Sequence, residues 1–75
     1  MLNQFLLVGK VTFVDKIIHT MITIDNGEYN IPVMANNNLS GIELIKVGDF
    51  IAVKGNVIFK YGNTQLMVEK MSWIS

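Results

Sequence analysis

The chain alternates apolar and polar residues over most of its length, which predicts β-strands. In residues 17–24, Ile18, Ile22 and Ile24 fall on one side of the strand. His19 and Met21 fall on the other side. Similar runs predict a strand in each of five segments, which are residues 2–14, 17–24, 28–35, 49–60 and 65–74. The pattern therefore predicts an all-β protein.

The first of these segments departs from the alternation. Phe5, Leu6, Leu7 and Val8 are consecutive apolar residues, and Gly9 follows them. A strand at the surface should send alternate residues to water, so the second apolar face needs a cover of its own. A glycine inside a strand is typical of a bulge or a sharp bend. We therefore predict a bend at Gly9 and a covered outer face.

Turn and edge signals lie near the middle of the chain. Asn26-Gly27 lies between two strand-like runs and predicts a hairpin with a two-residue type I′ turn. Pro32 has no backbone N–H to donate, so the strand over residues 28–35 must be an edge there or be interrupted. The sequence YGNT, which begins at Tyr61, indicates a second turn.

Residues 40–48 interrupt the strand pattern. Ser40 and Glu43 have the S-x-x-E spacing of a capping box, which marks the start of a helix. Gly48 is suited to the end of such a helix. We predict one short helix over Gly41–Lys46.

The order of the predicted elements is three strands, a helix and two strands. The two long strands, residues 2–14 and 49–60, each carry a glycine near the centre, Gly9 and Gly55. Glycine bends help a sheet to curl and close, which removes its edges. We predict that residues 1–75 form a single oligonucleotide/oligosaccharide-binding (OB) fold, a five-stranded barrel with one short helix between strands three and four. The alternative is an SH3-like barrel, and the position of the helix favours the OB-fold.

Composition narrows the chemistry available to the chain. Its 75 residues include no cysteine, no arginine and one histidine, and the formal net charge is zero. Disulfide bonds and thiolate metal sites are therefore excluded, and electrostatics alone should give only weak attraction to nucleic acid. A chain this short buries only about 60% of its unfolded surface. A domain this small usually needs an additional source of stability, and with disulfide bonds and thiolate metal sites excluded, oligomerisation is the one that remains.

The sequence offers no sign of catalysis or of membrane insertion. We find no nucleophile–base pair, phosphate-binding loop or metal-ligand spacing, so we predict that the protein is not an enzyme and uses no cofactor or metal. No apolar run approaches the roughly 18 residues of a membrane span. The N-terminus also lacks the basic region of a signal peptide. We predict a cytoplasmic protein.

Four segments together cover most of the chain and carry a family resemblance: LNQFLLVGKVT, GEYNIPVMA, IKVGDFIAVKGNV and QLMVEKMSWI. They resemble strands of bacterial single-stranded DNA-binding proteins, and the chain is also similar in size to the dimeric primosomal replication protein B. Three departures stand out. The second hairpin is cut to an Asn-Gly turn, no acidic tail precedes the end at Ser75, and Asn56 stands where the family has a basic residue. The resemblance implies a minimal member, of the kind that a phage, a mobile element or a reduced genome carries.

The resemblance implies binding of single-stranded DNA with little sequence preference, in replication, recombination or repair. In this mode bases stack on exposed aromatic rings and lysines contact the phosphates. The residues predicted to contact DNA are Lys10, Phe13, Tyr29, Lys54, Asn56, Lys60, Tyr61 and Trp73.

In the resembling family the first strands of two subunits lie side by side, which implies a homo-oligomer, either a dimer or a tetramer. The residues predicted at this interface are Asn3, Phe5, Leu6 and Val8. One alternative function is a protein-interaction module that docks on a replication or recombination enzyme. RNA binding of the cold-shock type is disfavoured, because the chain lacks the aromatic-rich, basic strands of that family.

Overall fold

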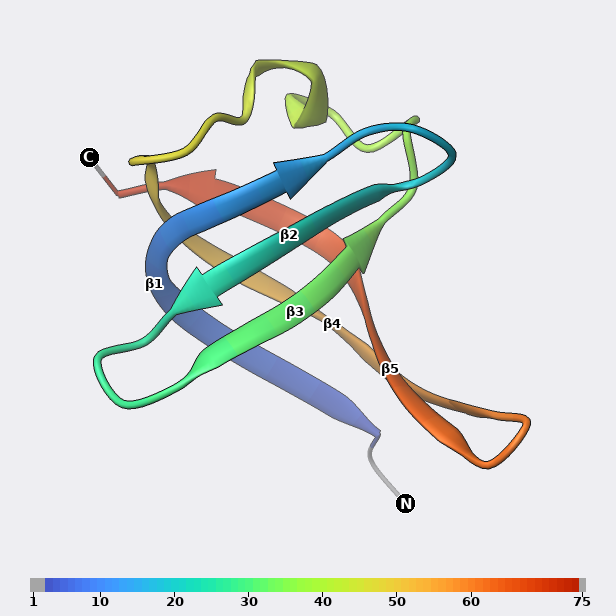
Figure 1. Ribbon diagram of the computed structural model, residues 1–75. Helices are drawn as coiled ribbons and strands as arrows, with labels where there is room; N and C mark the ends of the chain where they lie inside the picture. The colour runs from blue at the N-terminus through green and yellow to red at the C-terminus, as the bar shows by residue number, and fades with distance from the viewer. Residues whose placement is uncertain (1–2, 75) are drawn as a thin grey trace.

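The computed structural model describes residues 3–74, in which five strands close into a barrel (Figure 1). The strands are β1 (Gln4–Asp15), β2 (Thr20–Asp25), β3 (Asn30–Ala35), β4 (Phe50–Lys60) and β5 (Asn63–Trp73). A single 3-10 turn, η1 (Ile42–Leu44), lies between β3 and β4. The order around the barrel is β1-β2-β3-β5-β4, and only the β3–β5 pair is parallel. This confirms the predicted all-β, five-stranded OB-fold barrel.

The alternation of apolar and polar residues in the sequence corresponds to the alternation of side chains that point into the barrel and side chains that point to the outside. Along β2, for example, Ile22 and Ile24 are fully buried and Met21 is exposed. The sequence pattern therefore identified the core correctly, because every second side chain of a barrel strand points inward. The buried apolar residues are Val11, Ile22, Ile24, Val33, Ala35, Ile42, Ile45, Ile51, Val53 and Val68.

The glycines of the two long strands lie where another strand approaches closely. A Cβ atom on Gly9 would overlap the carbonyl oxygen of Asp25, and one on Gly55 would overlap the carbonyl oxygen of Met67. Both positions are buried. The predicted structural role of these glycines is therefore correct, although the bulge of β1 lies after Gly9, between Val11 and Phe13.

The short helix predicted over Gly41–Lys46 is present, but it is shorter than predicted, because η1 makes only one 3-10 turn. The residue at its N-cap position is Gly41 rather than Ser40, and no side chain caps the turn. Ile42 and Ile45 are both buried, and residues three apart align on one side of a 3-10 turn. One turn is thus enough to place both side chains in the barrel. Backbone hydrogen bonds that join Val11 to residues 48 and 49 then return the chain to the sheet.

The β2–β3 hairpin is present, but the predicted type I′ turn is wrong. Its loop has four residues, 26–29, and only Gly27 among them has a positive φ, whereas a type I′ turn needs two. The side-chain oxygen of Asn26 accepts hydrogen bonds from the backbone N–H groups of Glu28 and Tyr29. Such side-chain bonds compete with strand pairing. They explain why β3 begins two residues later than predicted.

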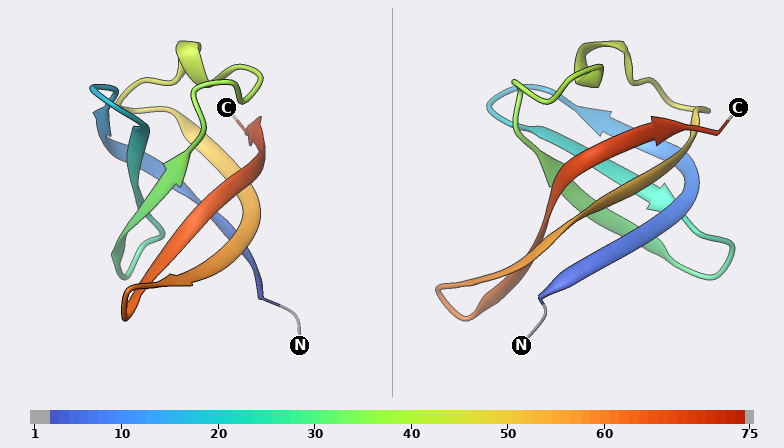
Figure 2. Two further views of the ribbon diagram at one scale, coloured as in Figure 1. Left: turned by 90° about the vertical axis from the view of Figure 1, so that its right-hand side faces the viewer. Right: turned by 180° about the vertical axis from the view of Figure 1, so that it is seen from behind.

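The β4–β5 hairpin extends beyond the rest of the barrel, at the end of the molecule opposite η1 (Figure 2). A two-residue turn joins its strands, since Lys60 pairs directly with Asn63. Within residues 3–74, no helix has both the length and the hydropathy that a membrane crossing requires.

Candidate nucleic-acid interface

The barrel has a weak seam between β3 and β5. These strands pair at only two positions, Met34 with Met67 and Ala35 with Val68, and the residues of each strand that precede these pairs diverge. Pro32 lies in the diverging part, where it pairs with β2 alone. This agrees with the edge position predicted from Pro32. The divergence leaves a groove on the outside of the barrel, and one part of this groove has a volume of about 390 Å³.

Methionines form a continuous row across this outer face. Met21 of β2 pairs with Met34 of β3, which pairs with Met67 of β5. The next row contains Phe13, Thr23 and Pro32. Phe13 is half exposed, and Met21 is 39% exposed. The outer face of β2 and β3 is therefore apolar, although it is the face that OB-folds use for ligands.

The groove consists of two adjoining hollows. The first, which we call the apolar hollow, is lined by Met21, Ile31, Pro32, Met34, Thr64, Gln65 and Leu66. The second, the polar hollow, has a volume of about 420 Å³ and is lined by His19, Met34, Ala35, Asn36, Lys60, Tyr61, Gln65 and Met67. Because both lists contain Met34 and Gln65, the two hollows form one surface, which we call the outer groove.

Tyr61 stands at the rim of the outer groove in an unusual backbone conformation. Its φ is 52°, and it is the only residue other than glycine with a positive φ in residues 3–74. Gly62 follows with a φ of 76°, so the positive φ values of a type I′ turn occur here. The tyrosine side chain is 90% exposed. The Nζ atom of Lys60 lies 5.5 Å from the centre of its ring, within the range of a cation–π contact.

The predicted lysines do not form one cationic patch. Lys54 and Lys60 are both on β4, six residues and therefore about 20 Å apart along the strand. Lys54 pairs with Leu6 of β1 and with Lys70 of β5, and these neighbours place it away from the outer groove. Lys10 pairs with Asp25 and with Phe50. Of the predicted lysines, only Lys60 lines the outer groove.

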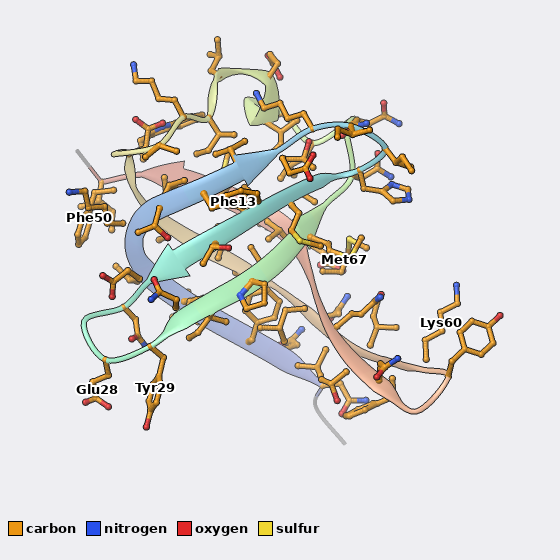
Figure 3. The ribbon with its side chains drawn as sticks, in the orientation of Figure 1. Phe13, Glu28, Tyr29, Phe50, Lys60 and Met67 are labelled. Carbon is orange, nitrogen blue, oxygen red and sulfur yellow. The ribbon has the colours of Figure 1, made fainter. Side chains whose placement is uncertain are left out.

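Two predicted aromatic residues lie away from the outer groove. Tyr29 is in the β2–β3 loop beside Glu28, far from Lys60 in Figure 3. Trp73 is at the end of β5, about 20 Å along the strand from Met67. A Cβ atom on Gly41 would lie 3.0 Å from two ring carbons of Trp73. Trp73 therefore packs against the segment that carries η1.

Trp73 also fixes a carboxylate at this end of the barrel. Its indole N–H donates a hydrogen bond of 2.9 Å to Oδ2 of Asp49. This bond lowers the pKa of Asp49, and the backbone N–H and charge of Lys46 lower it further, while burial acts in the opposite direction. The charged form of Asp49 is thereby favoured, and the indole is held in place.

The remaining predicted contact, Asn56, is next to Met67 in the sheet. Its side-chain amide donates a hydrogen bond to the Glu69 carboxylate. Of the eight predicted DNA contacts, the structure thus brings together Lys60 and Tyr61 in the outer groove, with Asn56 at its border. Phe13 is on the outer face, in the row beside the methionines, but it lines neither hollow. Lys10, Tyr29, Lys54 and Trp73 lie elsewhere.

The predicted oligomer residues divide between the two faces of β1. Leu6 is 71% exposed and Val8 is 43% exposed on the outer face. Phe5 faces inward and packs against the core. Asn3 precedes the strand, and its carbonyl accepts the N–H of Val57. The outer face has a shallow hollow lined by Leu6, Ala52, Val53, Lys54, Lys70, Met71 and Ser72.

Sequence reasoning did not select Met21, Met34, Met67, His19 or Gln65, all of which line the outer groove. The alternation shows which face each residue occupies within its own strand. It does not show which residues of different strands lie opposite each other, and that information was needed to find the methionine row.

Known structures share the fold of this chain, while no family model and no curated protein sequence matches it. Asparaginyl-tRNA synthetase from Pyrococcus horikoshii aligns with a TM-score of 0.77 and 18% identity, over 95% of this chain but only 19% of the synthetase. The mitochondrial single-stranded DNA-binding protein of S. cerevisiae aligns with a TM-score of 0.80 and 11% identity, over 99% of this chain and 94% of that one. The dimeric N-terminal domain of PriB protein from Thermoanaerobacter tencongensis aligns with a TM-score of 0.70 and 16% identity, over 97% of both chains. At these identities the likeness shows a shared OB-fold.

Proposed function

We propose that the chain binds single-stranded DNA along the outer groove, with the β4–β5 hairpin as its main contact. The observation that carries this proposal is Tyr61. A ring that is 90% exposed, in a left-handed turn and beside Lys60, is poorly explained by packing. Strained residues of this kind cluster at ligand sites. The likeness to a mitochondrial single-stranded DNA-binding protein supports the same interpretation.

Base stacking supplies most of the binding energy in this proposal. Tyr61 offers one ring at the rim, and Phe13 offers another on the outer face of β1. A stacked base is worth about 1–3 kcal/mol on an aromatic side chain. The methionines between them form a flexible apolar floor that adapts to bases of different shape. The apolar hollow therefore supports a proposal of binding with little sequence preference.

The proposal predicts a shallow dependence on salt. For single strands, the logarithm of the binding constant falls with the logarithm of salt concentration by about 0.7 per phosphate neutralised. Because Lys60 is the lysine at the outer groove, we expect a slope of about −0.7 and not the steep slope of a basic protein. Fluorescence anisotropy of a labelled thymidine oligomer at several salt concentrations measures it.

Matched lysine variants test the assignment of this slope. Lys60→Gln should remove most of the slope, whereas Lys46→Gln, at the η1 end, should leave it unchanged. The absence of binding at low salt with tens of micromolar protein would contradict the proposed function. If Lys60→Gln bound with the slope of the original chain, another surface would be responsible.

We further propose that the chain forms a homo-oligomer through the outer face of β1. Leu6, Val8 and Phe50 are exposed apolar residues on β1 and β4, which lie side by side. Exposed apolar patches of this kind are typical of protein interfaces. Several linked DNA sites would also raise the avidity of a weakly charged subunit. The same face supports the alternative function, docking on a replication or recombination protein.

A charge on this face should break the oligomer. We expect Leu6→Lys to reduce the mass in solution to that of one chain, as measured by light scattering after gel filtration. Leu44→Lys, at an exposed apolar position of η1, should leave the mass unchanged. If the original chain is already a folded monomer, the oligomer proposal fails and the docking alternative gains support.

A further inference from the structure

The two halves of the outer groove differ in chemistry. The apolar hollow is lined mainly by methionine, isoleucine, leucine and proline side chains. The polar hollow lies between the end of the β1–β2 loop, the residue that follows β3 and the β4–β5 hairpin. Its volume of about 420 Å³ falls within the range of small-molecule sites, roughly 300–1,000 Å³. Met34 and Met67 form part of its lining, and Tyr61 and Lys60 come from the hairpin.

Three polar side chains meet in the polar hollow: His19, Asn36 and Gln65. In the part of the chain that the structure describes, no protein group hydrogen-bonds to the His19 ring or to the Gln65 amide. The Oδ1 atom of Asn36 accepts the N–H of Asn38 at 2.9 Å. Its NH₂ group still has hydrogens to donate. The hollow therefore holds both donors and acceptors that the fold itself does not use.

These groups fit a planar ring whose edge carries donors and acceptors. A side-chain amide offers one donor beside one acceptor, and this pair matches the edge of a nucleobase bidentately. Thioether and tyrosine side chains suit the faces of such a ring, and Lys60 can reach the phosphate attached to it. In single-stranded ligands, unstacked bases are read in this way, by stacking combined with hydrogen bonds to their edges.

We propose that the polar hollow holds one nucleobase and reads its edge, with Gln65 as the main determinant. This inference rests on the proposed binding of single-stranded DNA and adds a base preference to it. The apolar hollow accepts any base through apolar contact with its methionine and aliphatic side chains, while one nucleotide of each bound segment is selected in the polar hollow. A homopolymer of the preferred base places that base in the polar hollow in every register of the bound strand. It should therefore bind more tightly than the other homopolymers.

Homopolymers of equal length test the inference. Anisotropy titrations with labelled oligomers of dA, dC and dT should give affinities for the original chain that differ by about tenfold between the best and the worst base. Gln65→Leu keeps the size of the side chain but removes its amide. We expect this variant to bind all three oligomers with affinities within about twofold of one another. Thr64→Val is the matched control, because Thr64 lines only the apolar hollow. It should change the affinity for all three oligomers by a common factor and therefore keep the tenfold range.

The possible outcomes separate the inference from the function on which it rests. If the original chain binds all three homopolymers equally, or if Gln65→Leu keeps the tenfold range, base reading in the polar hollow is overturned while DNA binding stands. If none of the three oligomers binds, the proposed function itself is overturned. The inference is supported if the tenfold difference in affinity among the three oligomers is lost in Gln65→Leu but kept in Thr64→Val.

Discussion

Gly55→Ala is expected to lower the free energy of unfolding by about 3 kcal/mol, the upper part of the usual range for overpacked cores. The added methyl group would overlap the carbonyl oxygen of Met67 and lie 2.9 Å from the Cα atom of Val68. Both of these atoms are backbone, which cannot turn aside as a flexible side chain can. A chain of this size has a total stability of only about 4–11 kcal/mol. The substitution should therefore remove a large part of it.

Urea denaturation followed by far-ultraviolet circular dichroism measures this effect. Ser72→Ala is a suitable control, because Ser72 is exposed on the neighbouring strand β5 and the substitution adds no atom. We expect it to change the free energy of unfolding by less than about 0.5 kcal/mol. An alanine at position 55 that unfolded at the same urea concentration as the original chain would show that β4 and β5 have room to separate.

The barrel was predictable because its causes are local in the sequence. Alternation fixes which side of each strand faces the core, and Gly9 and Gly55 fix where strands can approach one another. The length and the cap of the short helix were predicted incorrectly because they depend on distant residues. Ser40 and Glu43 satisfy the local rule for a helix start, but Ile42 and Ile45 reach the core in a single turn and Val11 holds the chain that follows.

The candidate site was predictable only by residue type. The preference of single-strand binders for aromatic rings and lysines selected Lys60 and Tyr61, which both line the polar hollow, but the same rule selected Trp73, which packs beside Asp49. The groove itself depends on the register between β3 and β5. That register joins residues more than 30 positions apart, and alternation within one strand carries no information about it.

Replacement of Tyr61 should separate stability from binding. Asparagine and glycine suit the positive φ values of a type I′ turn, and a side chain such as tyrosine costs roughly 1–2 kcal/mol in the left-handed region. We therefore expect Tyr61→Asn to raise the free energy of unfolding by about 0.5–1 kcal/mol. The same substitution removes the exposed ring, so affinity for a thymidine oligomer should fall by about 5- to 150-fold, which corresponds to one stacked base.

The opposite signs of these two changes are what distinguishes a binding residue from a structural one. A tyrosine that stabilised the hairpin would lower both stability and affinity when it was lost. Tyr29 provides the matched control, since it is also exposed in a hairpin loop but its φ is not positive. Tyr29→Asn should bring no gain in stability, and its affinity for the thymidine oligomer should remain within about twofold of that of the original chain, because Tyr29 lines neither hollow. If Tyr61→Asn were less stable than the original chain, or bound the oligomer equally well, the strain at Tyr61 would have no connection with binding.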